Sequence, residues 1–248
     1  MDYRLACADF TFPLLRHDQS LQLISMLGFD GVDIGLFEGR SHIQPSDQFT
    51  DPTATGAALK KRLDDLGLRC ADVFLQCDPD FTVYPINHPD VERRQHARDL
   101  FDKTLEYAAA AGADHITTLP GVLFPEQETA EDSWARCAEE LAWRIERCAT
   151  YKIPFGTEAH VGSIAPSPDG ARTLVSTVPE LKLTLDYTHF TRDGVPDEQI
   201  EDLIAHANHF HMRGARKDRL QASFDDNVID YGRVLDRMLA SNYPGYVG

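Results

Sequence analysis

The segments LGFDGVD (27–33), LGLRCAD (66–72) and AGADHIT (111–117) repeat one arrangement, in which a glycine closes a helical pattern and a short β-prone run follows. Glycine often ends helices because it adopts the left-handed backbone conformation without strain. Each segment therefore indicates the passage from a helix into a strand. Strands that alternate with helices pair in parallel as βαβ units, so these segments predict an α/β fold.

The same alternation of helical and β-prone segments continues through the whole chain. The segments 90–111 and 133–149 carry apolar residues at helical spacing, and Pro168, Pro196 and Asp197 stand where later helices would begin. β-prone runs recur eight times, at 3–9, 29–37, 68–76, 113–121, 153–160, 181–190, 208–214 and 243–248.

Eight such repeats, with no glycine-rich phosphate motif near the N-terminus, favour a (β/α)8 TIM barrel over a doubly wound sheet. No linker or low-complexity segment interrupts the chain, so we expect residues 1–248 to form one domain. The eighth run ends at Gly248. The sequence therefore predicts a barrel that is truncated at the eighth strand, with the last helix missing from this chain.

Composition narrows the classes of partner. The net charge of −16 argues against a nucleic-acid partner, because such proteins carry a basic surface. The five cysteines form no CxxC motif, which is typical of a reducing compartment. The first ten residues, MDYRLACADF, lack the pattern of a signal peptide, and no apolar run is long enough to span a membrane. We expect a soluble, cytoplasmic protein with no membrane partner.

The C-terminal ends of the barrel strands are where a site is expected. Glu158, Asp186 and His211 lie at the ends of three consecutive predicted strands. Two carboxylates and an imidazole are suitable ligands for a divalent cation. Other polar residues at predicted strand ends are Asp72, Gln76, His160, His189, His209 and Arg213.

The stretch HANHFHMRGA (206–215) places His209, His211 and Arg213 at alternate positions of a predicted strand. Alternate residues of a strand share a face, so the three side chains are expected to point the same way. A buried face with these groups needs polar partners. The stretch therefore indicates a site, with His209 one step deeper and bonded to a polar group or a supporting carboxylate.

Four segments carry a resemblance to a known family: GTEAHVGS (156–163), TLDYTHF (184–190), HFHMRGAR (209–216) and YPGYVG (243–248). They resemble the sugar phosphate isomerase/epimerase family of xylose isomerase-like barrels. The resemblance covers essentially the whole chain and is strongest from residue 153 onward. In that family a Glu, an Asp, a His and a second Glu bind Mn²⁺, Mg²⁺ or a similar ion.

The resemblance implies roles for particular residues. Glu158, Asp186 and His211 match the first three metal ligands, and the fourth would follow the segment that ends at Gly248. His189 matches a contact to a substrate hydroxyl in the ketose epimerases of the family.

Those epimerases also carry an arginine shortly after the histidine ligand, a place for which Arg213, Arg216 and Lys217 compete. His160 and Gln76 complete the expected substrate-binding set. The implied cofactor is one divalent ion, with Mn²⁺ as the first choice and Mg²⁺, Co²⁺ and Zn²⁺ as alternatives.

The function that these expectations favour is a metal-dependent isomerase or epimerase of a small keto sugar, with Glu158 as a catalytic base and an enediolate intermediate. The alternative is a lyase or dehydratase that acts on a keto sugar, keto-inositol or 3-keto-glycoside through the same enolate. An endonuclease for abasic DNA shares the barrel but needs more metal ligands and a basic face. A non-catalytic binding protein stays open, and a homo-oligomer is compatible with the family.

Overall fold

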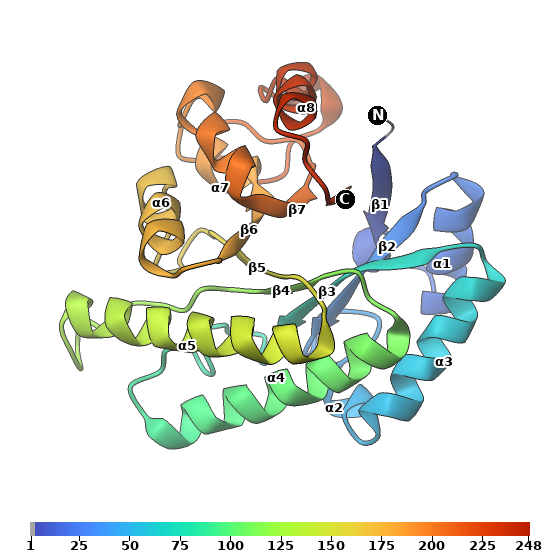
Figure 1. Cartoon of the computed structure of the whole chain (residues 1–248). Helices are drawn as coiled ribbons and strands as arrows, with labels where there is room; N and C mark the ends of the chain where they lie inside the picture. The colour runs from blue at the N-terminus through green and yellow to red at the C-terminus, as the bar shows by residue number, and fades with distance from the viewer. Residues whose placement is uncertain (1–2) are drawn as a thin grey trace.

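The computed structural model describes residues 3–248, and in this range eight parallel strands close into a barrel in the order β1 to β8 (Figure 1). The prediction of a single-domain TIM barrel is therefore confirmed. The last strand closes the barrel on the first, with Tyr246 opposite Arg4 and Val247 opposite Leu5. The strands are β1 (Arg4–Ala8), β2 (Gly31–Phe37), β3 (Arg69–Gln76), β4 (Ile116–Thr118), β5 (Phe155–Glu158), β6 (Lys182–Asp186), β7 (Ala207–His211) and β8 (Tyr246–Val247).

Helices follow most strands and cover the outside of the barrel (Figure 1). The α-helices are α1 (His17–Met26), α2 (Pro45–Gln48), α3 (Pro52–Asp65), α4 (Val91–Ala111), α5 (Ala130–Tyr151), α6 (Pro168–Thr177), α7 (Tyr187–Thr191) and α8 (Tyr231–Ala240). The 3-10 helices are η1 (Asp9–Thr11), η2 (Asp197–Gln199), η3 (Glu201–His206) and η4 (Phe224–Asp226). Among residues 3–248, none of the helices combines the length and the apolar character needed to cross a membrane.

Local sequence signals set the bounds of helix α4. The Asp90 side chain accepts hydrogen bonds from the backbone N–H groups of Glu92 and Arg93, which satisfies two donors that the first turn leaves free. Gly112 follows the helix with φ of 68°, in the left-handed region that glycine tolerates best. The helix therefore begins and ends where the sequence predicts.

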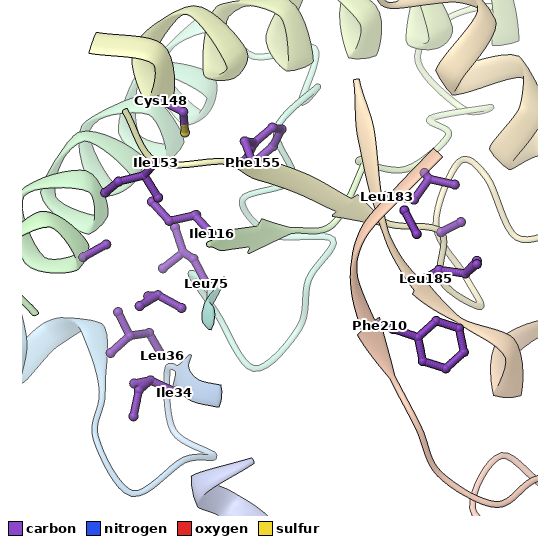
Figure 2. Close-up of a cluster of buried hydrophobic side chains, with 14 of the residues drawn as sticks. Ile34, Leu36, Leu75, Ile116, Cys148, Ile153, Phe155, Leu183, Leu185 and Phe210 are labelled. Carbon is purple, nitrogen blue, oxygen red and sulfur yellow. The ribbon is translucent and has the colours of Figure 1, made fainter. Parts of the chain in front are cut away.

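The strands have one apolar face and one polar face. Ile34 and Leu36 of β2, Leu183 and Leu185 of β6, and Phe210 of β7 are buried in the main hydrophobic core. Figure 2 shows these side chains together with Cys148 of α5, in the layer between the strands and the surrounding helices. Because successive residues of a strand point to opposite faces, the residues between them point into the barrel.

Every strand is shorter than its predicted run, and in β6 and β7 the difference changes where candidate site residues lie. β6 ends at Asp186, and α7 follows at once because the Asp186 carboxylate accepts a hydrogen bond from the N–H of Thr188. His189 therefore lies on a helix, and the strand expected as far as residue 190 is wrong in that part. β7 ends at His211, so Arg213 lies in the following loop, where its backbone N–H donates to the Tyr231 hydroxyl at 3.1 Å.

We expect Phe210→Ala to lower the free energy of unfolding by about 3–5 kcal/mol, because it removes a fully buried ring and leaves a cavity. Phe224→Ala is the matched control, since that ring is 95% exposed. Denaturant titration followed by circular dichroism measures both. An equal loss in the two variants would contradict the assignment of Phe210 to the core.

Candidate metal centre

Three of the inward-pointing side chains converge at the C-terminal ends of neighbouring strands. Glu158 ends β5, Asp186 ends β6 and His211 ends β7, and the strand register pairs Asp186 directly with His211. One ligand atom from each residue lies within 4.8 Å of those of the other two. The structure thus brings together the three residues that the sequence singles out as ligands.

Glu158 is a buried carboxylate with two imidazole side chains beside it. The Nδ1 atom of His211 lies 2.6 Å from its Oε1, and the Nε2 atom of His189 lies 3.6 Å from its Oε2. Burial alone would raise the pKa of this carboxyl group, but the contacts with His189 and His211 outweigh burial and hold the pKa well below its usual range. Glu158 is therefore ionised at neutral pH.

The other two members of the centre are also linked by charge. Burial would raise the pKa of Asp186, but the positive charges of Arg213 and His189 lower it. Burial would lower the pKa of His211, but its hydrogen bond to Glu158 raises that pKa to about 9. At neutral pH the centre therefore holds two carboxylate charges.

A divalent cation fits this donor set. Carboxylate oxygens and one imidazole nitrogen are ligands that Mn²⁺, Mg²⁺, Co²⁺ and Zn²⁺ accept. Glu158 and Asp186 are 3% and 1% exposed, and buried carboxylates need positive charge nearby. The residues that would hold the ion are Glu158, Asp186 and His211.

Three further residues expected to bind substrate surround the centre. His189 is fully buried on α7, with Nε2 3.5 Å from Asp186 Oδ2. Arg213 donates to the same Oδ2 atom from Nε at 2.9 Å and from Nη2 at 2.6 Å. The ring of His160 lies 4.1 Å from that of His189, and its Nδ1 donates to the carbonyl oxygen of Val161 at 2.6 Å.

The remaining two lie further out. Gln76 ends β3, lines the same cavity and accepts a hydrogen bond from the guanidinium group of Arg40. Arg216 is exposed and does not line the cavity. Its guanidinium group lies near the backbone carbonyl of Lys217, which is also exposed. Of the three basic residues after the histidine ligand, the structure brings Arg213 to the centre.

Below the centre lies a second layer of buried polar groups, in which Asp72 and His209 were named from the sequence but their partners His115 and Asp33 were missed. His209 Nε2 lies 3.2 Å from Oδ2 of Asp33, a residue of β2. Asp72 lies inside β3 rather than at its end, and its carboxylate is 2.7 Å from Nδ1 of His115. Asp72 therefore bonds a buried side chain and not loop backbone. Asp33 could have been predicted to point into the barrel, because it is an acidic residue between the apolar residues Val32 and Ile34 of the predicted strand 29–37.

The centre opens into a cavity of about 690 Å³. Glu158, His160, His211 and Arg213 are among the residues that line it, together with four phenylalanine side chains. Its volume lies within the range of roughly 300–1,000 Å³ typical of small-molecule sites. The arrangement can hold an ion beside an oxygen-rich ligand.

A family model described as a xylose isomerase-like TIM barrel matches residues 21–248. The chain belongs to this family. No curated protein matches significantly in sequence.

Solved structures with the same fold serve different chemistries. The 3-keto-D-glucoside 4-epimerase of E. coli is 15% identical with a TM-score of 0.73, over 99% of this chain and 90% of that one. An AP endonuclease of family 2 from Brucella melitensis is 19% identical with a TM-score of 0.78, over 100% and 92%. The IolI protein, solved with a bound zinc atom, is 17% identical with a TM-score of 0.70, over 98% and 87%. At these identities the likeness shows the fold alone.

We expect His211→Ala to lose the bound divalent ion, because it removes the only imidazole of the three-residue centre. Arg216→Ala is the matched control, since this exposed side chain lies outside the cavity. Elemental analysis after loading with Mn²⁺ and desalting measures the content. Retention of about one ion per chain by His211→Ala would contradict the centre.

The affinity for Mn²⁺ should fall as the pH falls. Below a pKa of about 9 the His211 imidazole holds a proton that the ion must displace. With one proton competing, the apparent affinity falls about tenfold for each pH unit between 8 and 6. Titration calorimetry at several pH values measures this slope, and a flat profile would exclude His211 as a ligand.

Proposed function

We propose that this protein is an isomerase or epimerase of a small keto sugar that uses one divalent ion, with Mn²⁺ as the first choice. The observation that carries the proposal is the convergence of Glu158, Asp186 and His211, of which Glu158 and His211 line one open cavity. The net charge of −16 weighs against a DNA substrate, although one protein with this fold is an endonuclease. The five free thiols suit the reducing conditions of the cytoplasm.

When bound, the ion would polarise the substrate carbonyl and stabilise the negative charge of an enediolate. Glu158 would take the α proton, a role that its ionised carboxylate and its place in the cavity lining support. Its Oε1 atom is bonded to His211, which leaves Oε2, on the His189 side, as the atom that receives the proton.

His189 and Arg213 would bind the substrate hydroxyl groups. Among residues 3–248, the buried Nδ1 atom of His189 has no hydrogen-bond partner, whereas its Nε2 atom lies 3.2 Å from Nη2 of Arg213. A ligand oxygen that reached Nδ1 would satisfy this group. Arg213 is two-thirds shielded from solvent and carries several donors in one plane. Both residues can orient a substrate that presents adjacent oxygens.

The position of the returning proton decides the reaction. Isomerisation needs only one base, since the proton can return to the neighbouring carbon on the same face. Epimerisation needs a second acid on the opposite face of the same carbon. Loss of a β-hydroxyl from the same enediolate would instead give an enone, which is the outcome of a lyase.

Solvent exchange tests the proposal directly. With Mn²⁺ and a panel of keto sugars in D₂O, we expect deuterium to enter the carbon next to the carbonyl, and Glu158→Gln to slow this exchange by at least about 10³-fold. Arg216→Ala should exchange at the wild-type rate. Mass spectrometry and proton NMR identify the product. No exchange with any sugar would end the proposal, and an enone absorbance without exchange into recovered sugar would replace it by elimination.

A further inference from the structure

Three phenylalanine rings form a continuous surface on one side of the cavity, the aromatic wall (Phe10, Phe37 and Phe74). The ring of Phe74 stacks on that of His211, with centroids 5.9 Å apart and an angle of 21° between the planes. Phe37 meets Phe74 edge-on at 5.1 Å, and Phe10 lies 5.1 Å from Phe37. The wall therefore leads from a candidate metal ligand outward in three ring-to-ring steps.

The backbone beneath the wall leaves room for it. Gly35 stands between Asp33 and Phe37 in the inward register of β2. A Cβ at Gly35 would lie 2.7 Å from Cδ1 of Phe10, closer than two carbon atoms can approach. The Phe10 ring, on η1, thus occupies the space that a side chain at residue 35 would fill, and it packs beside Phe37 of β2.

The apolar surface continues to the cavity mouth. Phe10 is 37% exposed, and Met212, on the loop after β7, is 39% exposed. Pro13 and Ala222 from the same two loops also line the cavity. Large apolar side chains left in contact with water beside a site commonly mark where a ligand binds.

The two sides of the cavity suit different parts of a ligand. The charged and imidazole groups of Glu158, His160, His211 and Arg213 can bind hydroxyl and carbonyl oxygens. The aromatic wall offers only C–H and ring faces. A hydroxyl pressed against it would lose its water partners at a cost of about 1–3 kcal/mol.

The aromatic wall is longer than one sugar ring. Rings in contact have centroids about 4.5–7 Å apart, so one sugar ring at the metal centre covers about one step and packs on Phe74. We propose that the substrate is a keto-glycoside, in which an apolar aglycone extends from the sugar and packs on Phe37 and Phe10. The sugar half of this inference rests on the proposed function, and the aglycone half rests on the aromatic wall.

Paired ligands test the inference. With the Mn²⁺-loaded full chain, we expect phenyl β-D-glucoside to bind at least about tenfold more tightly than methyl β-D-glucoside in equilibrium titrations. Phe37→Ala should reduce this preference to less than about threefold, and Phe37→Leu should leave an intermediate value. Phe224→Ala, whose ring is 95% exposed and outside the cavity lining, should keep the full preference.

Three results would overturn the inference: equal affinities for the two glucosides, a phenyl preference that survives Phe37→Ala, or no detectable binding of phenyl β-D-glucoside up to its solubility limit. The Glu158→Gln variant separates this inference from the proposed chemistry. It should lose solvent exchange and keep the phenyl preference. If the wild type prefers the phenyl glucoside but shows no solvent exchange, only the isomerase proposal is contradicted. If it shows solvent exchange but no preference for the phenyl glucoside, only the proposed aglycone is contradicted.

Discussion

The two-residue alternation of side chains along closed parallel strands is the constraint on which the site depends. Each strand must give its apolar face to the helices, so its other face points into the barrel whatever that face carries. In β6 this places Leu183 and Leu185 in the core and Asp186 inside. A shift of one residue in register would exchange the two faces and bury the carboxylate among aliphatic groups. The register of strand pairing therefore determines both which residues form the hydrophobic core and which residues form the site.

The inner face then has to balance its own charges. Asp33 meets His209, Asp72 meets His115, and Glu158 meets His211, so the described part of the chain pairs each of these buried carboxylates with an imidazole. Pairing of this kind is what makes buried charge tolerable, since an isolated ion in the interior would cost several kcal/mol. These pairs accordingly form a polar network inside the barrel, with the candidate metal centre at the C-terminal ends of the strands.

Most of the architecture was predictable because it follows local rules. The glycines at helix ends, such as Gly112, and the apolar runs mark each unit, and eight units imply a barrel. The ligand-type residues at three consecutive strand ends were predictable for the same reason. The positions of Arg213 and Arg216 were not, because both lie in a loop after β7 whose course depends on contacts with Tyr231 and other distant residues. The pairing of Asp33 with His209 joins β2 to β7 across the barrel, and nothing local in either segment specifies it.

The aromatic wall was not predicted from the sequence for the same reason: it depends on contacts between segments that are distant in the chain. Phe10 lies on η1, Phe37 at the end of β2 and Phe74 inside β3, and in each segment a single phenylalanine resembles an ordinary core residue. The three rings come together only in the folded chain, where Phe10 packs over Gly35 and beside Phe37.

The bond between Arg213 and Asp186 has a consequence for the order of events. The guanidinium group already neutralises the carboxylate that a divalent ion would need, through two hydrogen bonds to the same oxygen, and its Nη2 atom also lies 3.2 Å from Nε2 of His189. A divalent ion that bound Asp186 would have to displace this arginine, and the displaced guanidinium group would remain beside the cavity that Arg213 lines. Binding of the ion and binding of an oxygen-rich ligand to Arg213 would then be coupled, and each would strengthen the other.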